Sequence, residues 1–166
     1  MGGLDQLFKP ITDFVIIQLA FELSRQGHNL TGGLVKSFEA KVREVGDSIV
    51  IDFYMDSYGL SLNYGIKPNR IPYTVPPPFR GGTSKYIEGL IRFAQIKFGA
   101  DKKRAKQIAF AIAAKHKKFG FPLSGKIGFF DIALEANEEQ IKELISDYYE
   151  ATINLLINEF IESLNK

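Results

Sequence analysis

The side chains best suited to metal binding or proton transfer are few in this sequence, and their spacing does not bring them together. The chain has two histidines, His28 and His116, and no cysteine. Neither histidine belongs to a spacing such as His-x-x-x-His, which would place two imidazoles on one face of a helix. Lys115 and Lys117 flank His116 and disfavour a bound cation, so we expect His116 to be a solvent-exposed residue near the end of a helix.

Two carboxylates, Asp52 and Asp56, are the next candidates for chemistry, because a pair of acids can bind Mg²⁺ or exchange protons. A spacing of four residues along an extended strand puts them on the same face but about 13 Å apart. We therefore interpret both as ordinary solvent-facing residues.

The segment 81–85, Gly-Gly-Thr-Ser-Lys, resembles a phosphate-binding loop only superficially. In the P-loop the order Gly-Lys-Ser/Thr closes the motif, and that order is missing here. A flexible linker into a helix cap is the better interpretation. The sequence also contains no Gly-x-Ser-x-Gly elbow and no dinucleotide-binding glycine pattern. We therefore expect a protein without enzymatic activity, cofactor or bound metal.

Charge is unevenly distributed along the chain, although the formal net charge is only +2. Residues 83–120 contain ten Lys or Arg and two acids, whereas residues 131–166 contain nine acids and two bases. The two segments can pair within one chain or head-to-tail between neighbouring copies, or their charged faces can simply be solvated.

The basic segment is concentrated on one expected helix, residues 101–118. Its basic side chains are Lys102, Lys103, Arg104, Lys106, Lys115, Lys117 and Lys118. The basic residues at its beginning are unfavourable there, because the N-terminal end of the helix dipole is positive. A nucleic-acid phosphate backbone, bound without sequence preference, would explain their presence. A solvated face, or pairing with the acidic C-terminal helix, is the favoured interpretation. A nucleic-acid-binding module that uses helix 101–118 is therefore the alternative function.

Hydrophobic periodicity and turn residues predict the elements of the first third of the chain. Residues 11–26 are expected to form an amphipathic helix capped by Thr12 or Asp13. One face of this helix is expected to carry Phe14, Ile17, Phe21 and Ser24, with Ile16, Leu19 and Leu23 alongside. Two strands, 34–45 and 48–55, are predicted to follow, joined by the turn Gly46-Asp47 as an antiparallel hairpin. Residues 58–64 can form either a short helix or a third strand.

A proline-rich loop, at about 66–82, comes next. Its five prolines prevent regular secondary structure and make the segment extended and stiff. Its length favours an arm that docks on a neighbouring subunit, and the alternative is a loop that lies on its own domain. The residues expected to touch a neighbour there are Pro68, Ile71, Pro72, Tyr73, Pro76, Pro77, Pro78 and Phe79.

A pair of helices is predicted at 84–98 and 101–118, the first capped by Thr83 or Ser84 and the second by Asp101. The second has a thin apolar face rich in alanine, which would allow close packing against a partner helix. A short strand is expected within 127–132.

The last helix, 137–164, is expected to be capped by Asn137, and its second half is apolar nearly all round. One domain of this size rarely covers a terminal helix on every side, although complete burial within the chain is the alternative. The residues expected to contact another subunit are therefore Leu156, Ile157, Phe160 and Ile161.

These elements predict a single domain, residues 1–166, of the α+β class: a small antiparallel sheet packed by an N-terminal helix, a central helix pair and a long C-terminal helix. The most apolar stretch, 14–23, is about half as long as a bilayer requires and contains Gln18 and Glu22. Acids stand where a signal peptide would be basic, so we expect the protein to be made in the cytoplasm.

Four motifs, in this order along the chain, resemble the neck or tail-completion proteins of long-tailed bacteriophages related to the lambdoid type. They are the turn Thr31-Gly32-Gly33-Leu34-Val35-Lys36-Ser37, the segment Tyr58-Gly59-Leu60-Ser61-Leu62-Asn63-Tyr64-Gly65, the proline-rich stretch, and Phe129-Phe130-Asp131-Ile132-Ala133-Leu134 before a long helix. The chain departs from the family at Asp131 and Ile132, where proline-adjacent residues are common, and at Leu62, which replaces an aromatic. Its helix pair, 84–118, is also larger than usual.

The resemblance implies a structural virion protein that forms six- or twelve-fold rings between the head (portal) and the tail. It implies portal, adaptor and tail proteins as partners, and DNA that crosses the ring lumen without sequence-specific contacts. The matching residues would be structural: Thr31, Gly32 and Ser37 would set the turn, and Tyr58 and Tyr64 would pack beneath the loop.

Overall fold

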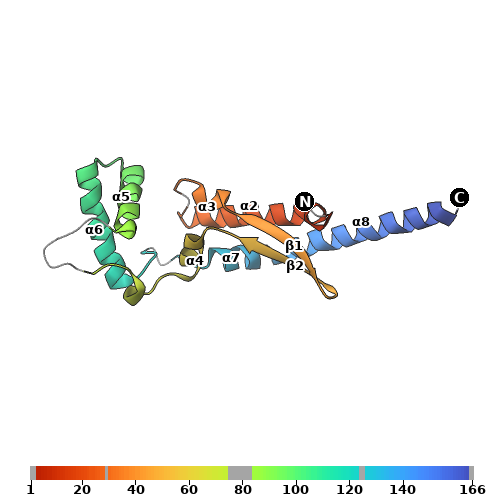
Figure 1. Ribbon diagram of the computed structural model, residues 1–166. Coiled ribbons are helices and arrows are strands. Elements are labelled where there is room, and N and C mark those ends of the chain that lie inside the picture. The colour runs from red at the N-terminus through yellow and green to blue at the C-terminus, as the bar shows by residue number, and fades with distance from the viewer. Residues whose placement is uncertain (1–2, 29, 75–83, 124–125, 165–166) are drawn as a thin grey trace.

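The computed structural model describes residues 3–28, 30–74, 84–123 and 126–164. Within them the chain has an α+β fold, mostly helical with one two-stranded antiparallel sheet, as the sequence predicts. The elements are α1 (Gly3–Leu7), α2 (Lys9–Arg25), α3 (Gly33–Lys36), β1 (Glu39–Val45), β2 (Ser48–Tyr54), α4 (Ser57–Tyr64), the 3₁₀ turn η1 (Pro68–Arg70), α5 (Lys85–Phe98), α6 (Lys102–Phe119), α7 (Phe129–Ala136) and α8 (Glu138–Leu164). The molecule is elongated: α5 and α6 form one end, and α8 projects from the other (Figure 1).

Helix α2 begins at Lys9, earlier than expected, because Pro10 occupies its first turn and suits that position. The predicted caps, Thr12 and Asp13, are wrong for this reason; Thr12 is buried inside the helix. The predicted apolar face is correct only in part. Leu19 and Leu23 are buried, as expected, but Ile17 and Phe21 are exposed, and the stripe that faces the core is rotated away from them. That stripe consists of Ile11, Val15, Leu19 and Leu23, four residues apart.

The predicted hairpin is confirmed, with β1 and β2 paired antiparallel from Glu39 opposite Tyr54 to Val45 opposite Ser48. Residues along β1 alternate between half-buried and exposed as far as Arg43. The expected strand start at residue 34 is wrong, because Gly32, with a φ of 71°, leads the chain into the helical turn α3. Ser37 then holds the turn: its hydroxyl donates to Leu34 O and accepts from Asp56 N.

The core lies where α2, α4, α7 and the hairpin meet. Its buried members are Val15, Leu19, Leu23, Leu34, Phe38, Leu62, Phe129 and Ala133. The strand expected within 127–132 is wrong, since Phe129 begins α7. Buried Asn63 stabilises that start: its side-chain oxygen accepts from Phe130 N at 2.9 Å, and its backbone oxygen accepts from Gly128 N at 2.7 Å. The segment 58–64, for which helix and strand were both open, is the helix α4.

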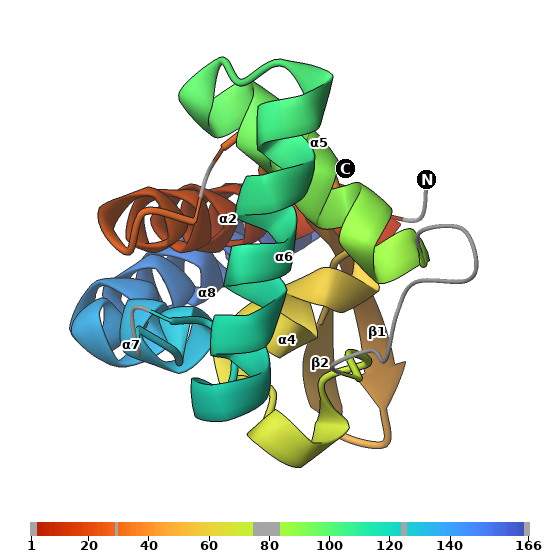
Figure 2. The same ribbon diagram turned by 90° about the vertical axis from the view of Figure 1, so that its left-hand side faces the viewer.

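The predicted helix pair is confirmed as a tightly packed hairpin, α5 and α6 (Figure 2). Ser84 Oγ and Asp101 Oδ1 accept hydrogen bonds from Ile87 N and Arg104 N. The cap at Asp101 is therefore confirmed, and of the two candidates for α5 the cap is Ser84. The contact face of the pair is made of fully buried alanines, which let the two helices approach closely. These are Ala94, Ala105, Ala109 and Ala113.

Helix α8 is 27 residues long; its first half packs on the body, and the helix projects beyond it (Figure 1). Ile141 packs against the core, and the rings of Tyr148 and Phe8 lie 4.8 Å apart. The side chain of Asn137 does not accept a capping bond but donates to Ala133 O at 2.8 Å, which joins α7 to α8. In the part of the chain described above, no helix is apolar over the length needed to cross a bilayer.

Candidate functional site

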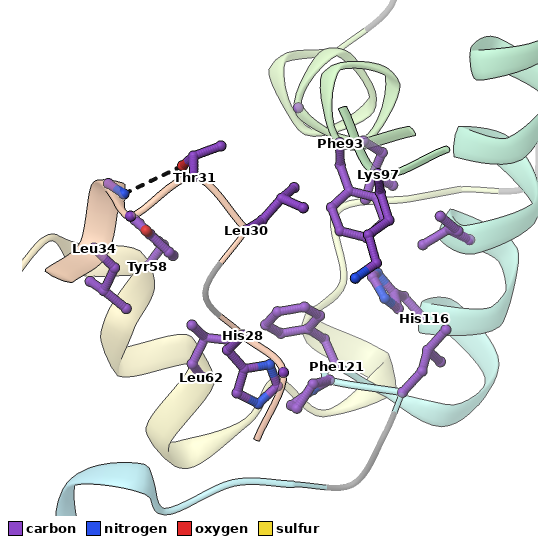
Figure 3. A pocket seen from close by; sticks show the side chains of 18 residues that line it. His28, Leu30, Thr31, Leu34, Tyr58, Leu62, Phe93, Lys97, His116 and Phe121 are labelled. Carbon is purple, nitrogen blue, oxygen red and sulfur yellow. Dashed lines mark hydrogen bonds between the residues drawn. The ribbon is translucent and has the colours of Figure 1, made fainter. Parts of the chain in front are cut away.

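A half-open cavity of about 510 Å³ lies between the α5–α6 hairpin and the body of the molecule. We call it the hairpin groove. Its walls are the loop after α2, the start of α4, the inner faces of α5 and α6, and the turn after α6 (Figure 3). It is lined by Gly27, His28, residues 30–34, Tyr58, Leu62, Gly89, Leu90, Phe93, Lys97, Ile112, His116 and residues 121–123. Most of these side chains are apolar, so the groove offers an apolar surface to a ligand or partner.

Short contacts hold the loop that forms one wall. Gly27, with a φ of +80°, ends α2, and His28 N then donates to Leu23 O at 3.0 Å. The His28 ring is fixed by a 3.0 Å hydrogen bond between Nε2 and Lys126 O. Thr31 Oγ1 accepts from Gly33 N at 3.4 Å, which tightens the turn into α3 (Figure 3). Thr31 and Gly32 thus sit in the turn that leads into α3.

The opposite wall contains the most deeply placed histidine. His116 is 5% exposed, and its Nδ1 lies 2.7 Å from the Tyr86 hydroxyl. Burial lowers the pKa of His116 and raises the pKa of Tyr86 to about 12. Burial therefore favours the neutral imidazole and the neutral phenol, which share this hydrogen bond. The expectation of a solvated His116 is wrong, because His116 continues the buried alanine face of α6, three residues after Ala113.

The second surface is an apolar stripe on the projecting part of α8. It consists of Tyr149, Ile153, Ile157 and Ile161, which we call the α8 stripe. The four are spaced four residues apart, so they share one side of the helix, and each is 48% to 54% exposed. Of the expected contact residues, Ile157 and Ile161 belong to this stripe, while the side chains of Leu156 and Phe160 lie outside the described set.

The first half of the proline-rich segment is held against its own chain. Ile66 and Phe121 form a β-bridge, which requires glycine at position 120, since a Cβ there would lie 2.7 Å from Ile66 O. Ile71 is only 3% exposed, so it is not open to a neighbour as expected; Pro68 and Pro72 are exposed.

Two contacts fix this segment on α6. Lys117 Nζ donates to Ile71 O at 3.2 Å, and the ring of Tyr73 lies 6.5 Å from that of Phe110. Lys117, expected among the DNA-facing residues, therefore has a partner within the chain. Pro76, Pro77, Pro78 and Phe79 lie outside the described residues.

Six of the seven expected DNA-facing residues are exposed on α6. They are Lys102, Lys103, Arg104, Lys106, Lys115 and Lys118. The expected pairing of this helix with the acidic C-terminal helix within one chain is not made, because α6 and α8 lie at opposite ends of the molecule (Figure 1). Lys142 of α8 pairs instead with Glu138 and Glu139 of the same helix, at 2.8 and 3.0 Å.

The remaining candidates have ordinary structural surroundings. Asp52 pairs with Arg43 across the hairpin, and this guanidinium lowers the pKa of the Asp52 carboxyl. Asp56 is exposed just before α4. Tyr64 is 71% exposed and does not pack beneath the loop as expected, whereas Tyr58 lines the hairpin groove. Among the described residues, no three His, Cys, Asp or Glu side chains gather where they could hold a metal ion.

No protein-family model, curated protein or solved structure matches this chain.

Proposed function

We propose that this protein is a structural virion subunit of a tailed bacteriophage, which forms a ring in the neck and joins the head (portal) to the tail around the DNA channel. The family is suggested by the four ordered sequence motifs. The observation that carries the assembly is the α8 stripe, a row of half-exposed apolar side chains on a helix that extends away from the body.

Exposing such an apolar stripe to water is unfavourable, and association with another subunit removes it from water. Burying apolar surface contributes roughly 25 cal/mol per Å², so four large side chains provide a substantial driving force for association. A helix of 27 residues spans about 40 Å, which carries the stripe well clear of its own core. Contiguous exposed apolar surface of this kind marks protein–protein contacts.

The two ends of the molecule are different, and this favours a ring. One end presents the basic α5–α6 hairpin and its groove, and the other presents the acidic helix α8. When unlike surfaces meet, the contact repeats from copy to copy, and it closes into a ring if the rotation between copies allows. Head-to-tail placement also brings basic α6 toward acidic α8 of the next copy, which orients the encounter.

The ring assignment is tested by measuring mass and shape in the presence of the expected neighbour. We expect light scattering and negative-stain images to show six- or twelve-fold rings, either of the protein alone or stacked on purified portal rings. A protein that stays monomeric and joins neither portal nor tail rings would contradict the proposal.

Contact with DNA is the second candidate function, and one observation favours it. Lys102, Lys103, Arg104 and Lys106 are exposed at the start of α6, and in the described part of the chain no ion pair neutralises them. These four positive charges lie at the positive end of the helix dipole, and a negatively charged DNA phosphate backbone would stabilise them there. Such binding would not depend on the DNA sequence.

Titration with duplex DNA at two salt concentrations tests this candidate. We expect binding at low salt that weakens by at least tenfold at high salt, and further weakening when Lys102 and Lys103 are both changed to Glu. The matched control changes Gln107 and Ala111, two exposed neutral positions of the same helix, to Glu. Equal loss in both double variants, or no binding at low salt, would remove the candidate.

A further inference from the structure

Two apolar surfaces are left uncovered by the described residues, and they lie at opposite ends of the molecule. The hairpin groove is a half-open cavity of about 510 Å³, and the α8 stripe is a row of half-exposed side chains. Within one molecule they cannot meet, because the body separates the hairpin from the projecting helix (Figure 1).

We infer that the α8 stripe of one copy docks into the hairpin groove of the next copy. The inference rests on the proposed ring-forming function, since it specifies which two surfaces of neighbouring subunits meet. The occupant is a second copy of this chain, and the contact is heterologous, with a different surface contributed by each side.

The chemistry of the two surfaces matches. A helix that docks in a groove uses apolar anchors spaced three or four residues apart, and the stripe supplies four anchors at that spacing. From Tyr149 to Ile161 the stripe extends about 18 Å along the helix. The groove receives such anchors with apolar walls, to which Leu30, Leu90 and Phe93 contribute.

The charges around the two surfaces are also complementary. Exposed acids, Asp147 and Glu150, lie within a turn of Tyr149 on α8. On the other side, Lys97 lines the groove and Lys115 is exposed on α6. Opposite potentials at the rim of an apolar contact steer the encounter and disfavour pairing between like surfaces, such as one acidic α8 against another.

Gly89 provides a clean way to block the groove. It lines the groove on α5, and a Cβ built there meets no other atom within 4 Å. A glutamate at this helical position therefore fits the fold, but places a charge in the apolar surface and repels acidic α8. Gly89→Ala is the matched control, since it adds one methyl group and no charge.

Ile157 provides the corresponding block on the helix. Its side chain is half exposed, so Ile157→Glu removes an anchor without opening the core. Asn158→Glu is the matched control, because it adds the same charge at the adjacent exposed position, about 100° around the helix. Far-ultraviolet circular dichroism and thermal unfolding establish that all four variants fold as the wild type does.

Sedimentation of the wild type and variants over a concentration series tests the inference. We expect the wild type and both controls to form multimers, and Gly89→Glu and Ile157→Glu each to raise the dissociation constant on the order of tenfold or more. An equimolar mixture of the two blocked variants retains one intact groove and one intact stripe. It should therefore form dimers and nothing larger.

Two results would overturn the inference and separate its failure from that of the ring proposal. If Gly89→Glu assembles like the wild type while Ile157→Glu does not, α8 contacts a surface other than the groove, and ring formation survives. If the wild-type protein alone stays monomeric at every concentration, copies do not dock on one another in this way, and the portal-binding experiment decides the function.

Discussion

Single side chains connect parts of this fold that are distant in sequence, and Asn63 is the clearest case. It lies buried at the end of α4, and its side chain accepts from Phe130 N and donates to Asp131 Oδ2 at 3.2 Å. The first of these bonds satisfies the Phe130 amide in the first turn of α7, where backbone N–H groups have no partner within the helix, and the second ties the Asp131 side chain to α4. One residue thus fixes where α7 begins.

Asn63→Ala should lower the free energy of unfolding by about 2 kcal/mol, because it leaves the partly buried Phe130 amide without an acceptor. Urea denaturation measures this directly. Asn158→Ala, at an exposed position of α8, should change stability by less than about 0.5 kcal/mol. Equal effects at the two sites would show that Asn63 does not hold α7.

His116 makes stability depend on pH. Burial lowers its pKa in the folded protein, so below about pH 6.5 the unfolded chain binds more protons than the folded one. The contribution of His116 to the free energy of unfolding is therefore fully present above that pH. It is lost as the pH falls toward the pKa of His116 in the folded protein.

We therefore expect the free energy of unfolding to decrease between about pH 7 and pH 5.5, and His116→Gln to weaken that decrease. Chemical denaturation at a series of pH values is the measurement. A slope that His116→Gln leaves unchanged would mean that the imidazole takes up its proton equally in both states.

At the scale of elements, local signals predicted most of the structure correctly. The hairpin follows from Gly46-Asp47 between two apolar runs, and the helix pair follows from the caps Ser84 and Asp101. The strand expected within 127–132 is a helix, because a short apolar run does not distinguish a strand from a buried helix start. The helical start is fixed instead by the hydrogen bond from Phe130 N to Asn63, which lies more than sixty residues earlier in the chain.

The alanine face of α6 sets how closely the hairpin packs. Ala109 is fully buried against α5, so Ala109→Leu should overpack the contact and cost about 1–3 kcal/mol in unfolding free energy. Ala114→Leu, on the exposed side of α6, should be nearly neutral. Equal unfolding midpoints for the two variants would contradict this account of the hairpin.

At the scale of the whole molecule, the sequence predicted surplus apolar surface on the last helix. It did not predict that this helix would project from the end of the molecule opposite the α5–α6 hairpin. The charge segments were visible in the sequence, yet their separation to opposite ends depends on tertiary structure. The hairpin groove was missed because its walls come from five separate segments; the one local signal was Leu30, an apolar residue in a polar linker. The proline-rich segment was predicted as an arm, but its first half rests on α6, where Ile71 is buried.

The central claim is that copies of this chain assemble through the projecting α8 helix. Mass measurement of the wild type and Ile157→Glu, each mixed with portal rings over a concentration series, tests it most directly. We predict ring particles of six or twelve copies for the wild type and single copies for Ile157→Glu. Wild-type protein that remains at the mass of one copy throughout, or Ile157→Glu that forms the same rings, would contradict the account.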